Sequence, residues 1–201
     1  MQSSAEAFVA HELLHRTPWI FQSDREYVTW RVELAEDLQV DPFAIVIVGS
    51  ACTGYSLNPA KEFRKFNQAS DIDVAIVSHR HFEDSWRWLR DLKPADLLTG
   101  SLEADMFKWH RRNLVFDGTI ATDRLLSRLP FGPIWASGLN KASSRLPSQG
   151  HAVKGRIYRD FESLRSYHVK NIAGLRRDLQ ATTTVPTGTK LRLVDAEDAA
   201  K

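Results

Sequence analysis

Two acidic residues two positions apart, Asp71 and Asp73, are the side chains whose types and spacing best suit chemistry. They lie in residues 70–77, where acids alternate with apolar side chains, and this alternation predicts a β-strand. Both carboxylates then leave one face of the strand, while Ile72 anchors the opposite face in the core. Two carboxylates held this close repel each other unless a divalent cation lies between them. The pair therefore predicts a site for Mg²⁺ or Mn²⁺.

A glycine and a serine, Gly49 and Ser50, end an apolar, β-branched run at residues 43–48. Such a continuous run predicts a strand that is covered on both faces. The Gly-Ser turn offers backbone N–H groups and a hydroxyl to triphosphate oxygens, because glycine permits close backbone approach and a following helix N-terminus favours an anion. Metal ions on the aspartates can activate an attacking oxygen and stabilise a leaving pyrophosphate. The two motifs together predict chemistry on a nucleoside triphosphate.

A hydrophobic strand that ends in Gly49-Ser50, followed by a strand with Asp71-Ile72-Asp73, resembles the DNA polymerase beta-like nucleotidyltransferase superfamily. The resemblance covers residues 45–77. It implies a small mixed β-sheet flanked by helices and a Mg²⁺-dependent transfer of an NMP from an NTP. It also implies that Asp71 and Asp73 are catalytic metal ligands and that Gly49 and Ser50 bind the nucleotide. The acceptor is not implied, because members modify proteins, small molecules, RNA and DNA, and some make signalling oligonucleotides.

The segment between the two motifs is longer than the usual loop of that superfamily. Its additional residues, 57–66, include the cations Lys61, Arg64 and Lys65. Cations at this spacing either form a solvated helix face or lie near the phosphates. Both interpretations are compatible with the sequence.

The superfamily normally has a third carboxylate on a later strand, where it often activates the acceptor. If residues 152–158 form that strand, Asp160 lies just past its end. If the strand is instead residues 113–116, Asp117 and Asp123 are the candidates. The sequence does not decide among the three acids.

The outward positions of the 152–158 strand include Lys154 and Arg156, which have the wrong charge for binding a metal. A cation beside Asp71 and Asp73 would partly neutralise them and weaken the binding of a second metal. The alternative function is therefore a catalytically inactive relative that binds a nucleotide, an RNA or a protein as a regulator or antitoxin.

The remaining pattern predicts an α/β (α+β) domain over residues 1–180, with N- and C-terminal helices, the core motif at 43–77 and a tail at 181–201 that is flexible or a linker. A capping box at Ser23 and Glu26 predicts the start of a helix that ends at Asp41-Pro42. Prolines and glycines at 117–150 predict an irregular insertion with short helical pieces. The apolar stripe predicted for the helix after Ser23 consists of Val28, Val32, Ala35 and Leu38. The other predicted helices are 5–14, 81–92, 102–115 and one after Asp160, with Phe161, Leu164, Ile172, Leu175 and Leu179 along one stripe.

The bulk composition is that of an ordinary globular protein: 201 residues, 43% hydrophobic, 26% charged, with a net charge of +2. This charge gives no global field for nucleic acid or membrane binding. The single cysteine, Cys52, excludes an intramolecular disulfide and a cysteine-based zinc site, and we expect it to be buried. The N-terminus lacks a signal-peptide pattern and no apolar run could span a bilayer, so we expect a cytoplasmic protein with no membrane partner. His168 is expected to be packed, and neither His79 nor His81 has a partner at metal-ligand spacing.

Overall fold

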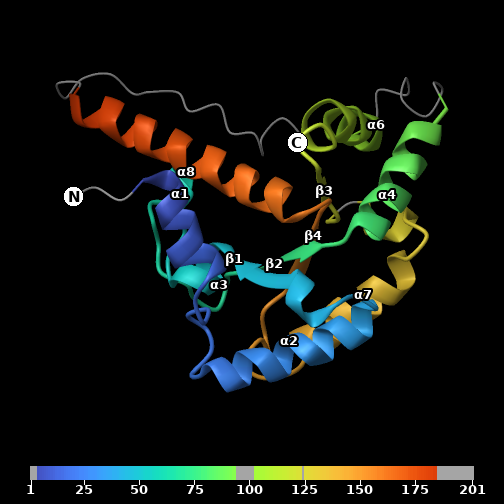
Figure 1. Ribbon diagram of the computed structural model, residues 1–201, viewed down its shortest axis with the longest axis horizontal. Coiled ribbons are helices and arrows are strands. Elements are labelled where there is room, and N and C mark those ends of the chain that lie inside the picture. The colour runs from blue at the N-terminus through green and yellow to red at the C-terminus, as the bar shows by residue number, and fades with distance from the viewer. Residues whose placement is uncertain (1–3, 94–101, 124, 185–201) are drawn as a thin grey trace.

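The computed structural model describes residues 4–93, 102–123 and 125–184, in which four strands form one mixed sheet (Figure 1). The strands are β1 (Ile45–Val48), β2 (Ile72–Val77), β3 (Thr119–Ala121) and β4 (Val153–Tyr158), in the order β1-β2-β4-β3. β2 runs antiparallel to β1 and parallel to β4, and β3 runs antiparallel to β4. The predicted α+β class, a small mixed sheet flanked by helices, is therefore confirmed.

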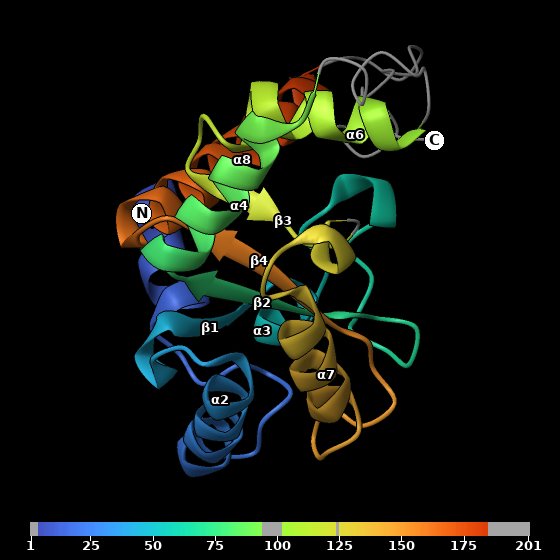
Figure 2. The same cartoon turned by 90° about the vertical axis from the view of Figure 1, so that its right-hand side faces the viewer.

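Helices cover both faces of this sheet (Figure 2). α2 (Asp24–Leu38) and α7 (Gly132–Ser143) lie across one face, while α8 (Phe161–Thr184) and α1 (Ala5–Phe8) lie across the other (Figure 1). α4 (His79–Asp91) follows β2 directly. The pocket described below is lined by residues from the start of β2 and of β4.

Alternation along β2 divides the buried side chains between the two faces. Ile72, Val74 and Ile76 belong to the large core cluster that also includes Leu34 of α2 and Trp135 of α7. Ala75 points the other way, into a smaller cluster that also includes Val48 and, on β4 and α8, Tyr158 and Leu164. The period of two makes Asp73 a neighbour of Ala75 on that second face. The core therefore determines the direction in which Asp73 points.

Ser23 caps α2 as predicted. Of the four residues predicted for its apolar stripe, Ala35 and Leu38 are buried but Val28 and Val32 are not. The Ser23 hydroxyl accepts from the Glu26 N–H at 3.2 Å, whereas the Glu26 carboxylate accepts from the N–H of Gln22, at 2.8 Å. Val28 and Val32 are 36% and 37% exposed, because a more aromatic face of the helix turns toward the sheet and α7. α2 ends at Leu38, followed by Gln39 in the left-handed conformation, before Asp41-Pro42. The buried residues of α2 are Tyr27, Trp30, Leu34, Ala35 and Leu38.

Residues 117–150, predicted as an irregular insertion with short helical pieces, are more regular than that, because they contain β3 and the twelve residues of α7. Its prolines and glycines serve the helix: Pro133 lies in the first turn, where a missing N–H costs nothing. A Cβ on Gly138 would lie 2.9 Å from atoms of Asp37 and Leu38. Glycine at that position therefore allows close contact between α7 and α2.

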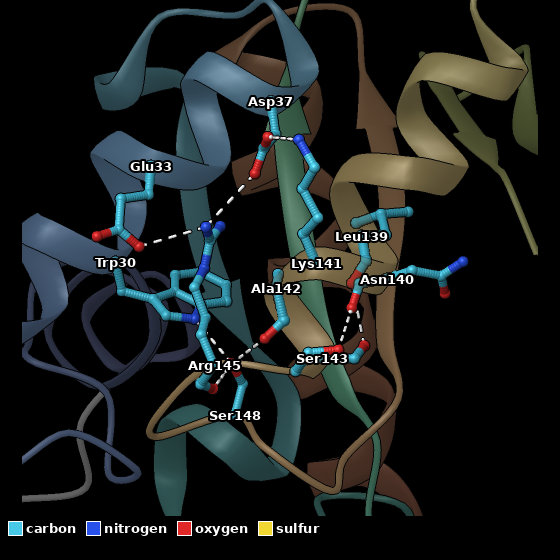
Figure 3. A network of polar contacts seen from close by, with 11 residues as sticks. Trp30, Glu33, Asp37, Leu139, Asn140, Lys141, Ala142, Ser143, Arg145 and Ser148 are labelled. Atoms are coloured by element: carbon cyan, nitrogen blue, oxygen red, sulfur yellow. Dashed lines mark hydrogen bonds and ion pairs between the residues drawn. The ribbon is translucent and has the colours of Figure 1, made fainter.

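Polar contacts hold the segment after α7 against α2 (Figure 3). Nη1 of Arg145 lies 3.3 Å from Oε2 of Glu33 and 3.4 Å from Oδ2 of Asp37. The indole N–H of Trp30 donates to the Ser148 hydroxyl at 2.8 Å. Because this segment leads into β4, these contacts help to position the strand that completes the site.

Several predicted bounds shift by one or two residues, and some predicted helices continue as other helix types. β1 begins at Ile45 because Pro42–Ala44 is a 3₁₀ turn, which leaves Phe43 75% exposed. Residues 113–116 do not form a strand, since the helix α6 (Leu102–Trp109) continues as a π-helix over His110–Leu114. Along α8, Leu164 and Ile172 are buried, but Phe161 and Leu179 are exposed. The other elements are the π-helix Val9–Leu14, α3 (Gly49–Thr53) and the 3₁₀ turns Pro59–Lys61 and Leu126–Arg128.

The C-terminal prediction is tested only in part, because α8 extends to Thr184 and so includes the first four residues of the predicted tail. Residues 185–201 lie outside the described residues. Among the described helices, none has both the length and the apolar character needed to cross a bilayer.

Candidate functional site

The two aspartates line one pocket of about 400 Å³ at the start of β2. β1 and β2 are neighbours, and Val48 is level with Asp73 in their register. Asp71 comes one residue before β2, which begins at Ile72 rather than at residue 71. Both carboxylates nevertheless reach the same pocket, because residues two apart point to the same side.

Gly49 brings the backbone directly against the Asp73 carboxylate. Its φ is +66°, a left-handed conformation that side chains with a Cβ disfavour. A Cβ at this position would lie 2.8 Å from Oδ2 of Asp73. Ser50 follows in the short helix α3, and it also lines the pocket. The structure thus brings together all four residues predicted for the site.

Two cations from β4 share the pocket with the aspartates. In the parallel register Lys154 is level with Asp73, and its Nζ lies 2.6 Å from Oδ2 of Asp71. Arg156 lies two residues further along the same face of β4. Its guanidinium donates to the Tyr167 hydroxyl of α8 and stacks on that ring, 5.1 Å from the ring centroid. The predicted approach of Lys154 to the acidic pair is therefore seen.

The electrostatic environment of Asp73 disfavours its charge. The carboxylate keeps contact with solvent, yet the protein around the pocket removes enough water to raise its pKa to about 6. Arg156 opposes this increase, whereas Asp123 and Asp71 add to it. A divalent cation would relieve the repulsion among these acids, so the raised pKa of Asp73 is compatible with a metal ligand.

Of the three candidates for a third carboxylate, Asp123 lines the pocket. Asp117 instead pairs with Lys170 at 2.6 Å. Asp160 accepts from the N–H of Ser163 at 2.7 Å, and this bond and the Arg159 guanidinium lower its pKa to about 2. Within residues 4–93, 102–123 and 125–184, no three His, Cys, Asp or Glu side chains are grouped closely enough to hold a metal. Asp123 therefore lies near the aspartate pair without completing a three-acid cluster.

The loop between the motifs, residues 55–66, brings two of its three predicted cations to the pocket. Lys61 and Arg64 line it, and Lys65 does not. The base of the loop is held by Phe66, whose ring centroid lies 4.8 Å from that of His151 and 5.8 Å from that of Trp19. The interpretation of these cations as near the phosphates is therefore compatible with the geometry for two of the three.

Sequence reasoning missed the polar residues of this loop. Ser56 and Asn58 line the pocket, as does Ser70 just before the aspartates. Tyr167, which holds Arg156, also went unnoticed because it lies on α8 among residues that we assigned to an apolar stripe. Its position one helical turn after Leu164, on the sheet-facing side, was the available signal.

The remaining titratable candidates lie outside the pocket. Cys52 is buried as expected, and burial raises the pKa of its thiol to about 12. His168 lies 3.5 Å from the Tyr158 hydroxyl, and burial lowers its pKa to about 4. His81 is 3% exposed and packs edge-on against Phe131. Cys52 and His81 are parts of the packed interior, and His168 is half-buried.

Comparison of the chain with family models, with curated proteins and with solved structures finds no match in any of the three.

Proposed function

We propose that this chain is a metal-dependent nucleotidyltransferase, which transfers an NMP from an NTP to an acceptor. The observation that supports this best is the single pocket that contains Gly49, Ser50, Asp71 and Asp73. These residues come from two motifs about twenty positions apart, and the folded chain brings them together on one side of the sheet. Their resemblance to the polymerase beta-like pattern is the reason for assigning this reaction.

The donor set of the pocket fits Mg²⁺ or Mn²⁺. Mg²⁺ is usually bound by one or two carboxylates together with phosphate oxygens and water, and Asp71 and Asp73 would supply the carboxylates. When bound, the metal would activate the attacking oxygen and stabilise the leaving pyrophosphate. The Gly49 backbone and the Ser50 hydroxyl would hold the triphosphate, with Lys154 and Arg156 balancing its charge.

In the proposed reaction an acceptor hydroxyl oxygen attacks the α-phosphorus, and the bond from that phosphorus to the bridging oxygen breaks. Pyrophosphate leaves, and the hydroxyl proton passes to Asp123. Asp123 suits this role because it lines the pocket and has no ion-pair partner among the described residues. The acceptor is a protein, an RNA, a small molecule or a second nucleotide. We place the protein in the cytoplasm, which its single, buried cysteine suits.

The test is release of labelled pyrophosphate from each of the four NTPs with Mg²⁺ or Mn²⁺, in the presence of each class of acceptor. We expect one NTP to give turnover that Asp73→Asn and Asp123→Asn abolish. Asp117→Asn is the matched control, because Asp117 is an acid paired with Lys170 rather than a residue of the pocket. Turnover that survives Asp73→Asn would refute the assignment.

A second candidate is a catalytically inactive protein that binds a nucleotide as a regulator or antitoxin. The 2.6 Å ion pair between Lys154 and Asp71 favours it, because the ammonium group already neutralises one of the two acids. In that case the protein binds an NTP in equilibrium dialysis, and no NTP gives pyrophosphate with any acceptor. The pyrophosphate assay and the binding assay together distinguish the two functions.

A further inference from the structure

The loop of residues 55–66 presents two unpaired cations to the pocket. Lys61 and Arg64 both line it, and neither has an ion-pair partner in the described part of the chain. Glu62 lies between them in sequence but does not line the pocket, and its side chain is exposed. Lys61 and Arg64 therefore add positive charge to this wall of the pocket.

The backbone between the two cations has an unusual conformation. Glu62 and Phe63 have φ angles of 50° and 51°, so two consecutive residues with a Cβ adopt the left-handed conformation. Such residues disfavour this conformation, and where it persists the surrounding structure must hold it. Backbone strain of this kind clusters at active sites and ligand clamps.

Hydrogen bonds within the loop hold the turn in this shape. The N–H of Glu62 donates to the Pro59 carbonyl at 2.9 Å, and the N–H of Arg64 donates to the Lys61 carbonyl at 3.0 Å. The Arg64 carbonyl accepts from the N–H of Ser56 at 2.9 Å, which ties the turn to the other limb of the loop. The backbone that carries the two cations is thus ordered by the chain itself, and binding loses less entropy when the segment that binds is already ordered.

We propose that residues 61–64 form a clamp for the polyphosphate chain of an NTP, in which Lys61 and Arg64 bind the phosphates farthest from the nucleoside. This inference rests on the proposed function, because that function assigns the phosphate nearest the nucleoside to the acidic side of the pocket. An arginine fork and a lysine ammonium both bind phosphate oxygens, and two cations suit a chain of phosphates better than a single one. The clamp lies in the segment by which this chain departs from the superfamily pattern.

The test measures binding of inorganic tripolyphosphate by calorimetry, in EDTA so that no metal contributes. We expect Lys61→Met and Arg64→Met each to weaken the affinity by about tenfold or more. Lys65→Met is the matched control, since it removes a cation from the same loop that does not line the pocket, and its affinity should stay within about twofold of the wild type. Equal losses in all three variants would show a diffuse charge effect and overturn the clamp. Wild-type binding of tripolyphosphate no tighter than that of orthophosphate would also overturn it.

A second pair of variants tests the backbone without touching the two cations. Glu62→Gly and Glu62→Val remove the same charge, but glycine accepts a φ of 50° while a β-branched residue resists it. We expect Glu62→Gly to keep the affinity for tripolyphosphate and Glu62→Val to lower it. Equal affinities in the two variants would contradict the role of this turn.

Failure of the clamp and failure of the proposed function give different results. If no NTP is turned over but the Lys61 and Arg64 variants lose tripolyphosphate binding selectively, the clamp stands and the transferase does not. If turnover occurs and both variants keep the wild-type KM for the NTP, the transferase stands and the clamp is wrong.

Discussion

The ammonium nitrogen of Lys154 lies 2.6 Å from Oδ2 of Asp71, although the two residues are 83 positions apart in the chain. They meet because β2 and β4 are parallel neighbours, with Lys154 level with Asp73. A divalent cation that binds Asp71 must therefore compete with this ammonium group for the same carboxylate.

Removal of that competitor should strengthen metal binding. We expect Lys154→Met to raise the affinity of the nucleotide-free protein for Mn²⁺ by about threefold to tenfold. This is the change in affinity that corresponds to the energy of one partly exposed ion pair, which the metal no longer has to break. Electron paramagnetic resonance of free Mn²⁺ during a titration measures this directly. Lys170→Met is the control, because it breaks an equally short pair, with Asp117, away from the pocket. An unchanged or lower affinity in Lys154→Met would contradict the competition.

Replacement of Asp71 or Asp73 should abolish metal-dependent NTP binding without lowering the stability of the fold. We expect Asp73→Asn to abolish metal-dependent NTP binding while Tm at neutral pH, in EDTA, stays unchanged or rises. The reason is that burial, together with Asp123 and Asp71, already disfavours a charge on Asp73. Asp71→Asn should likewise abolish this binding with Tm unchanged or slightly raised, because its partner Lys154 is partly exposed and can be solvated. A marked drop in Tm for either variant would indicate a structural role instead.

Alanine substitutions at Gly49 and Gly150 distinguish the cost of backbone strain from the cost of a steric clash. Both Gly49 and Gly150 have positive φ, but a Cβ on Gly150 meets nothing within 4 Å, whereas one on Gly49 lies 2.8 Å from Oδ2 of Asp73. Gly150→Ala should cost about 1–2 kcal/mol of unfolding free energy from conformation alone. Gly49→Ala should cost more and should also displace Asp73, so that NTP binding is lost. Chemical denaturation measures the unfolding free energies, and equilibrium dialysis measures NTP binding. If both variants lost the same unfolding free energy and Gly49→Ala still bound NTP, the close contact with Asp73 would be contradicted.

His81 should make the protein less stable as the pH falls below neutrality. Burial, together with the Arg80 charge, lowers the pKa of His81 from 6.5 to about 4. The unfolded chain therefore binds a proton at a higher pH than the folded one does, so stability is full above pH 6.5 and is lost as the pH falls toward 4. Between pH 7 and pH 5 we expect a loss of about 2 kcal/mol from this residue.

Urea unfolding at the two pH values measures that loss. His81→Gln should reduce the difference in unfolding free energy between pH 7 and pH 5. Because the two values are compared within one variant, any effect of the substitution on packing is the same at both pH values and cancels. His79→Gln, at an exposed histidine two residues away, should leave the difference as it is in the wild type. The same reduction in both variants would rule out His81 as the source.

Local alternation was enough to predict the central part of the site. The acids Asp71 and Asp73 alternate with Ile72 and Val74, and burial of those two side chains leaves one direction for the carboxylates. The strand at 152–158 was one of two alternatives for the third strand, and β4 (Val153–Tyr158) lies there. Such predictions succeed because a strand needs only its own pattern and a core on one face.

The features that the sequence did not predict depend on contacts between distant segments. Gly138 looks like a helix breaker until α2 is seen to pack against it. Val28 and Val32 fit a helical stripe, but the position of the sheet and α7 selects a different face of α2. Asp123 reaches the pocket because β3 joins the sheet beside β4, with Ala121 level with Arg156. No pattern within any one of these segments contains that information.

The strand order has a consequence for how the molecule is made. β4 is the last of the described strands to be synthesised, yet it lies between β2 and β3 and closes the sheet. Until the ribosome has released it, the emerging chain holds β2 with one unpaired edge and β3 with no partner at all. Exposed strand edges of this kind invite pairing with other chains, and long-range closure is slow. The nascent protein is therefore most vulnerable to aggregation just before Val153–Tyr158 is made, and a protein truncated ahead of that strand should be insoluble as well as inactive.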